Sequence, residues 1–283
     1  TGANNVAVGY ATLCTNTTAS NNIAVGSEAL QANTTGNDLV AIGCGALYNN
    51  TTAADNIAVG YQSQFNTTTG HSNVSMGWQS MVTNSTGINN TSIGFESLKA
   101  NTTASNNTAV GQQALKTNTT GCENVAVGRQ ALALNTTGDN NVAIGIYSLE
   151  ANTTANDNTA VGACSMVATT TGNFNVAIGT CTLFTGTTAA TSVAIGHHAM
   201  KLTTTASDNV AIGRSSLCTN TTGCRNTAVG RDSLKANTTG IENVGVGSEA
   251  LDSLTTGSFN TAVGYQAVQA VTTGGYNTGL GYK

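Results

Sequence analysis

The chain has 283 residues, of which 8% are charged and 39% hydrophobic, and its formal net charge is −4. So few cations leave no basic face for nucleic acid and no polybasic patch for an anionic membrane surface. No apolar run reaches the length of a membrane span, so we expect neither nucleic-acid binding nor membrane insertion. Length alone allows one or two globular domains.

A strict sequence period replaces that estimate. Glycine recurs every 17 residues without insertion or deletion, so each repeat should make the same turn of the backbone. We number the repeat positions as slots, with Asn4 in slot 1 and the first full repeat ending at Ser20. We expect one repeat domain over 1–283. Neither Thr1 nor Lys283 lies in a segment that looks like a cap, so we expect the chain to be part of a longer fibre or its ends to be covered by neighbours. The glycine column in slot 6 comprises Gly9, Gly26, Gly43, Gly60, Gly77, Gly94, Gly111, Gly128, Gly145, Gly162, Gly179, Gly196, Gly213, Gly230, Gly247, Gly264 and Gly281.

The first element of each repeat is a short strand over slots 2 to 5. Slot 2 is asparagine in 15 of 17 copies, with Leu39 and Ser192 as the exceptions. Slot 3 is Val, Ile or Thr, slot 4 is Ala, Ser or Gly, and slot 5 is always apolar, which is the alternation of a strand. Slots 3 and 5 share one face, which we expect to line the interior. The small residues of slot 4 then face outward and suit close approach by another sheet.

The remaining slots predict a corner, a second strand and a turn. Glycine in slot 6 suits a corner that needs positive φ or a close backbone approach. Slots 7, 8 and 11 vary freely, slot 9 is small, and slot 10 is Leu, Met or Val except for Gln64. This pattern predicts a second short strand over slots 8 to 11, with the slot-10 side chain inward. Slots 13 to 16 read Asn-Thr-Thr-Gly or a close variant, which is typical of a turn.

These elements together predict an all-β fold, a parallel β-solenoid (β-roll) of 17-residue coils that stack at about 4.8 Å. A helical fold is excluded because strong helix formers are few and no 3.6-residue spacing occurs. Slot-2 asparagines should form an amide ladder, and the Thr-Thr slots hydroxyl ladders. Each coil has a small apolar interior to offset the entropy cost of ordering its backbone, which favours a homotrimer over a single-chain rod.

The repeat resembles two related families. The strand core NVAIG, followed by a small residue and a Gly-terminated turn, resembles the head repeats of trimeric autotransporter adhesins. The sequence NTAVGQQALKTNTTG, from Asn107 to Gly121, and NTAVGYQ, from Asn260 to Gln266, are similar to repeats of phage tail-fibre and bacterial surface fibre proteins. The resemblance implies a left-handed β-roll, trimerisation and an extracellular, cell-surface or virion location. The coil is longer than in the adhesins, and no heptad stalk accompanies it.

Repeated Asn-Thr-Thr or Asn-Ser-Thr turns match the N-glycosylation acceptor pattern. Turn chemistry copied by duplication would also produce them, and glycans on adjacent coils would crowd. The candidate acceptors are Asn16, Asn33, Asn50, Asn66, Asn84, Asn101, Asn118, Asn135, Asn152, Asn220 and Asn237.

The seven cysteines are scattered over slots 7, 8, 11 and 17 and form no framework. Cys164 and Cys181 share slot 8 on neighbouring coils, within the Cα separation of a disulfide, while Cys218 and Cys224 flank one turn. Both pairs are candidate disulfides, with free surface thiols as the alternative.

Catalysis and cofactor binding find little support in the sequence. The acids lie mostly in outward slots, and Asp232 with Glu249 in slot 8 is more typical of a solvated face than of paired catalytic carboxylates. His197 and His198 lack a cysteine or acid at ligand spacing, so we expect no metal, no cofactor and no enzyme activity. Slot-7 aromatics such as Trp78 can contribute to a sugar-binding strip, although Arg129 and Ser27 share that column.

We therefore interpret the chain as the non-catalytic shaft of an extracellular fibre. Its expected partner is itself, as a homotrimer or an end-to-end filament, with surface glycans as further partners. A host- or glycan-binding adhesin head is the second hypothesis. Ice binding is the third hypothesis, and it ranks last. Two hydroxyl rows on one face need threonines at alternate positions, whereas the threonines of slots 14 and 15 are adjacent and should point apart.

Overall fold

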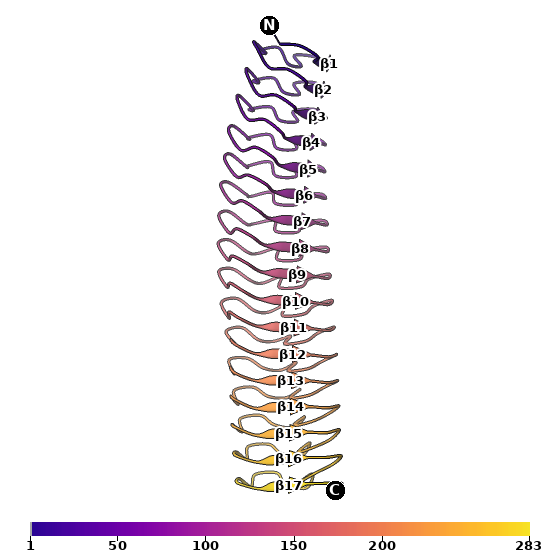
Figure 1. Cartoon of the computed structure of the whole chain (residues 1–283), viewed down its shortest axis with the longest axis vertical. Coiled ribbons are helices and arrows are strands. Elements are labelled where there is room, and N and C mark those ends of the chain that lie inside the picture. Colours follow the sequence, from indigo (N-terminus) through magenta and orange to yellow (C-terminus); the bar gives the residue numbers. More distant parts are fainter. Residues whose placement is uncertain (1) are drawn as a thin grey trace. The chain divides into compact units, whose positions relative to one another are not determined.

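A computed structural model describes residues 2–283, which form two compact units, up to Asn140 and from Asn141. Each unit is a stack of coils with one three-residue strand per coil, and the described residues contain no helix, hence none able to cross a membrane. The first unit holds β1 (Val6–Val8), β2 (Ile23–Val25), β3 (Val40–Ile42), β4 (Ile57–Val59), β5 (Val74–Met76), β6 (Thr91–Ile93), β7 (Thr108–Val110) and β8 (Val125–Val127) (Figure 1). The second holds β9 (Val142–Ile144), β10 (Thr159–Val161), β11 (Val176–Ile178), β12 (Val193–Ile195), β13 (Val210–Ile212), β14 (Thr227–Val229), β15 (Val244–Val246), β16 (Thr261–Val263) and β17 (Thr278–Leu280).

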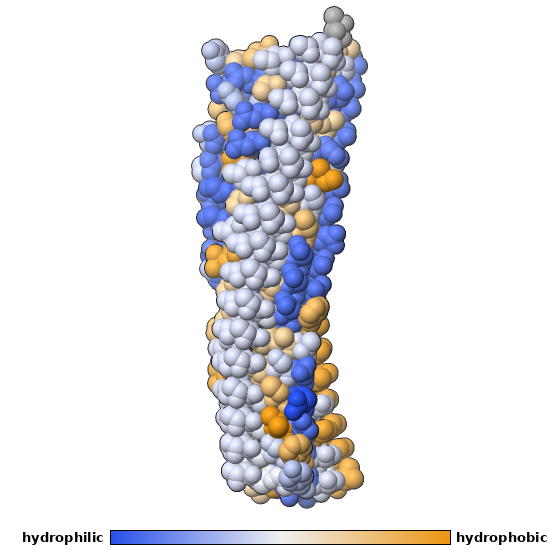
Figure 2. Space-filling model, turned by 90° about the vertical axis from the view of Figure 1, so that its left-hand side faces the viewer, coloured by the Kyte–Doolittle hydropathy of each residue, from blue (hydrophilic) through white to orange (hydrophobic). Residues whose placement is uncertain are grey.

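Strand pairing confirms the predicted solenoid within each unit. Every pair is parallel and joins a residue to the one 17 positions later, as in Ala41 with Ala58 or Ala194 with Ala211. Equivalent slots therefore stack into columns. Figure 2 shows such columns on one face, where residues of similar hydropathy follow one another along the stacking direction.

The predicted orientation of the strand is wrong. Slot 4 points inward, and Ala24, Ala41 and Ala58 are fully buried. Slots 3 and 5 point outward, so that Ile23 is 42% and Ile42 is 40% exposed. The space inside one coil admits a leucine against an alanine, but not two branched side chains from the strand as well.

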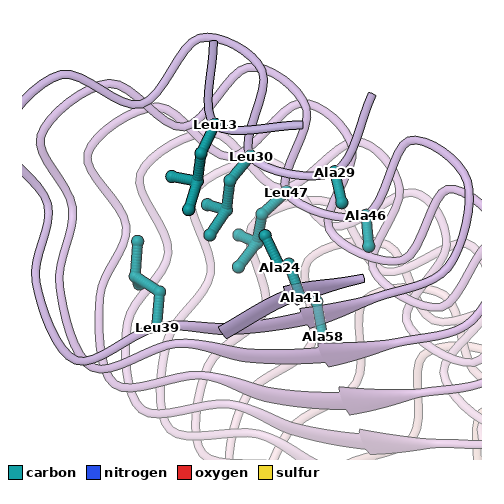
Figure 3. Packing of buried hydrophobic residues seen from close by; sticks show 9 residues of the cluster. All are labelled: Leu13, Ala24, Ala29, Leu30, Leu39, Ala41, Ala46, Leu47 and Ala58. Atoms are coloured by element: carbon teal, nitrogen blue, oxygen red, sulfur yellow. The ribbon is translucent and has the colours of Figure 1, made fainter. Parts of the chain in front are cut away.

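Slot 10 supplies the large interior side chain, as predicted. Leu30 and Leu47 are fully buried, and Figure 3 shows them stacked with Leu13 and pointing toward the strand alanines. Leu39, which replaces the slot-2 asparagine, enters the same cluster from the other side. The core is a column of leucines facing a column of alanines.

The predicted second strand over slots 8 to 11 is also wrong. Residues in slots 8 and 10 have positive φ, for example 52° at Gln62 and 50° at Leu47. Alternating left-handed residues bend this segment into successive turns. Its amides still bond to the next coil, as Leu30 N does to Ala46 O at 3.0 Å.

Two separate constraints require glycine in slot 6, its positive φ and its close approach to the next coil, and both confirm the predicted corner. At Gly26, φ is +131°, a conformation that L residues rarely adopt. A Cβ there would lie 2.6 Å from the carbonyl carbon of Gly43, the equivalent glycine of the next coil. Glycine therefore sets both the backbone angle and the coil spacing.

The predicted slot-2 amide ladder is confirmed. Asn56 Oδ1 accepts bonds from the backbone N of Asn73 at 2.9 Å and from Asn73 Nδ2 at 3.2 Å. Asn73 Nδ2 also donates to the slot-16 carbonyl of Gly87 at 2.9 Å. Asn243 repeats these three bonds in the second unit. The ladder satisfies buried backbone groups that no strand reaches.

Candidate functional site

The variable slots 7, 8 and 11 lie on the turns that follow each strand, and they form the chemically diverse surface of the coil. Slots 8 and 10 alternate in the left-handed region, which turns slot 10 inward and leaves slots 7 and 11 on either side of slot 8. Side chains in these columns meet their equivalents on neighbouring coils. Surface chemistry therefore comes in ladders.

Aromatic rings form two ladders on the turns after β3 to β6. In slot 7, the ring centroids of Tyr61 and Trp78 are 6.0 Å apart, those of Trp78 and Phe95 are 5.0 Å apart, and the planes are nearly parallel. In slot 11, Tyr48 and Phe65 stack at 4.7 Å. We call these five residues the aromatic platform. The three slot-7 rings remain 41–44% exposed.

Slot 8 runs between the two ladders and is polar. Gln79 Nε2 donates to Gln62 Oε1 at 2.8 Å. One coil further, Lys99 Nζ is 2.5 Å from Glu96 Oε1 and 5.7 Å from the centroid of the Trp78 ring. A slot-11 lysine thus crosses slot 8 to reach the edge of the platform.

Glu96 anchors the polar end of this surface. It is 8% exposed and accepts hydrogen bonds from Lys99, from Lys116 at 2.9 Å and from Gln113 at 3.0 Å. Burial alone would raise the pKa of the carboxyl, but these three donors outweigh burial and lower the pKa to about 2. The group is a permanent anion at neutral pH and no general acid.

The same slots carry ion pairs in the second unit. Asp232 lies between three cations, at 3.3 Å from Arg214, 3.7 Å from Arg231 and 3.3 Å from Lys235. Arg231 also bonds Glu249. The acidic pair noted in the sequence is therefore neutralised by arginine and lysine.

Nine of the eleven predicted glycan acceptors are buried. Their amides form a second ladder, which the sequence did not suggest: Asn101 Nδ2 donates to Asn84 Oδ1 at 2.9 Å and to Ala104 O at 3.1 Å. An amide nitrogen with both hydrogens donated inside the protein cannot carry a glycan while the coil is folded. Asn16 and Asn66 are half-buried and stay predictions. The nine with no exposed surface are Asn33, Asn50, Asn84, Asn101, Asn118, Asn135, Asn152, Asn220 and Asn237.

All seven cysteines are free thiols, so neither candidate disulfide is formed. Cys164 and Cys181 are neighbours, and burial together with the adjacent Cys181 raises the pKa of the Cys164 thiol. Burial also raises the pKa of Cys218. Cys224 Sγ instead accepts a bond from Ser207 N at 3.4 Å. A raised pKa keeps a thiol protonated and poorly nucleophilic.

Histidines and acids do not converge on a metal site in residues 2–283, where no three potential ligands lie close enough to hold an ion. The rings of His197 and His198 stack with centroids 3.7 Å apart. Burial, His197 and Lys201 lower the pKa of His198.

The predicted hydroxyl ladder of slot 14 is wrong for the threonines whose bonds are described, because their hydroxyls bond to the backbone of the next coil. The slot-14 hydroxyl donates to the slot-14 carbonyl of the next coil, as Thr102 Oγ1 does to Thr119 O at 3.1 Å, rather than to another hydroxyl. Slot-15 threonines such as Thr103 are exposed. The turn therefore presents one free hydroxyl row.

The slot-11 ladder and the glutamine ladder were missed in the sequence. Tyr48 and Phe65 are 17 residues apart, as are Gln62 and Gln79, so the period itself was the signal.

Comparison with protein-family models, with curated proteins and with solved structures finds no match to this chain.

Proposed function

We propose that the chain is a non-catalytic structural shaft of an extracellular fibre and that it assembles with itself through the outward face of its sheets. The observation that carries this proposal is the outward apolar column of slot 5, present on every coil and flanked by Val, Ile or Thr in slot 3. The homotrimer, the extracellular location and the phage or bacterial surface context are supported by the resemblance of the repeat to those of trimeric autotransporter adhesins and of phage and bacterial fibre proteins.

The sheet face has the composition of an interface. Met76 and Ile93 in the first unit, and Ile144, Ile178 and Ile212 in the second, are each about two-fifths exposed. Slots 3 and 5 hold no charged residue in any copy. Monomeric proteins rarely expose contiguous apolar patches beyond a few hundred Å², and larger ones mark interaction sites. Another copy of the same face would bury these columns in register.

The interior supports a mechanical role. Two asparagine ladders and the strand hydrogen bonds tie each coil to the next, and ion pairs such as Arg214 with Asp232 link neighbouring coils on the surface. This arrangement resists local opening without requiring a large core. It suits a spacer that holds another structure away from a surface.

Sedimentation equilibrium of the full chain tests the assembly. We expect a species of three times the 28.3 kDa chain mass. The double substitution Ile42→Lys and Ile93→Lys places charges on the apolar columns and should give monomers that keep the β-sheet circular dichroism. The matched control, Thr69→Lys with Thr103→Lys on the exposed turn column, should remain trimeric. A monomeric wild-type chain would refute the proposal.

A further inference from the structure

We propose that the aromatic platform binds a linear polysaccharide that runs along the stacking direction, with one sugar ring per coil. The proposal goes beyond the shaft function and does not depend on the trimer. It assigns a ligand class to the outward slots of the first unit.

The rings provide the apolar part of the site. Offset stacking at 5.0–6.0 Å leaves part of each slot-7 ring uncovered, and Trp78 at the centre is 41% exposed. Their mutual stacking holds the rings in place before a ligand arrives, which lowers the entropy cost of binding. Sugar rings carry apolar C–H faces that pack on such surfaces.

The glutamine ladder provides the polar part. Gln62 Nε2 and Gln79 Oε1 are the two ends of that ladder, and among the hydrogen bonds of the described residues neither has a protein partner. The ligand must therefore accept a hydrogen bond from Gln62 Nε2 and donate one to Gln79 Oε1. A hydroxyl group does both, and a sugar carries several.

The spacing favours a polysaccharide over a peptide. Equivalent rings and amides repeat once per coil, at about 4.8 Å, whereas an extended peptide advances about 3.3 Å per residue and would drift out of register. A polymer of pyranose rings has a repeat close to the coil spacing. Three successive coils then present an aromatic ring in slot 7, and the first two of them present a glutamine amide in slot 8.

The chain has one tryptophan, and it lies at the centre of the platform. Titration of the full chain with hydroxyethyl cellulose, a neutral polysaccharide, or with polygalacturonate, an acidic one, should change the Trp78 emission in a saturable way. A change with either polymer supports the proposal, and no change with both overturns it.

Affinity electrophoresis in gels that contain the same polymers separates the platform from non-specific binding. Tyr61→Ala with Phe95→Ala should weaken retardation at least tenfold, and Gln62→Leu with Gln79→Leu should weaken it several-fold. The control is Tyr10→Ala, a slot-7 tyrosine that is 78% exposed and has no ring stacked on it in the described structure. Equal retardation of the platform variants and the wild type would overturn the proposal. Sedimentation reports the trimer separately, so failure of one proposal is distinguishable from failure of the other.

Discussion

The turns after β4 to β6 and those after β13 to β15 place opposite chemistry on the same backbone. Slots 7 and 8 hold Trp78 and Gln79 in the first region, but Arg231 and Asp232 in the second. Slot-8 φ is 50° at Gln79 and 56° at Asp232, so the coil path is unchanged. Backbone and surface are therefore specified by different slots.

The interiors of the two regions match in detail. Met81 and Leu234 fill slot 10 without exposure. The neighbouring slot-9 hydroxyl bonds the slot-4 carbonyl one coil on, at 3.0 Å for Ser80 and 2.9 Å for Ser233. Substitutions inside the coil should thus act equally in both regions, while surface substitutions should not.

The largest effect should come from the corner glycine. Gly77→Val and Gly230→Val each force a branched side chain into φ of +141° or +130° and against the next coil. We expect each to cost at least about 4 kcal/mol, in the range that marks a lost backbone conformation. Amide hydrogen exchange should show the affected coil and its neighbour opening. Thr103→Val, on the exposed turn, is the control and should change little. Tolerance in one region alone would mean that the scaffolds differ.

Removal of the core side chain comes next. Met81→Ala and Leu234→Ala each leave a cavity under a slot-4 residue and should cost about 2–5 kcal/mol. The free energy of unfolding in urea measures both. The two losses should agree within about 1 kcal/mol, and a larger gap would contradict the shared interior.

Glu96→Gln distinguishes the first region. The folded-state pKa is lowered to about 2 against an ordinary 4.5, which sets an upper bound of about 3 kcal/mol on the stabilisation by this carboxylate at neutral pH, because its lysine partners are partly exposed and screened. That contribution is complete above pH 4.5 and is lost as the pH falls toward 2. The stability difference between Glu96→Gln and the wild type should therefore shrink across this window. A difference independent of pH would contradict the role of the charge.

Asp232→Asn should have the smallest effect. Its cationic partners are 49–59% exposed at 3.3–3.7 Å, whereas those of Glu96 are 32–36% exposed at 2.5–2.9 Å. We expect a loss of about 1 kcal/mol or less, because exposed pairs are screened. Unfolding at about 1 M salt should abolish the loss. A salt-independent loss as large as that of Glu96→Gln would contradict this ranking.

The sequence predicted those features that the period alone determines: the coil length, the slot-6 corner, the slot-2 ladder and the inward slot 10. It did not determine which strand face is buried, because alternation defines two faces but not the room available to each. The left-handed φ at Leu47 could not be predicted from the sequence, because leucine does not favour that region. The burial of Asn101 was hidden as well, since Asn-Thr-Thr is typical of exposed turns. Neighbouring coils decide these positions.

The contact between successive corner glycines limits how such a chain can change its length. One extra residue would move every later position by a slot, so that a side chain would replace the glycine at φ near +130° and polar residues would enter the alanine column. Loss or gain of an entire circuit keeps every later residue in its slot and preserves the stacking of the corner glycines. Reach is thus adjustable in discrete steps, by deleting or duplicating complete turns, without any redesign of the fold.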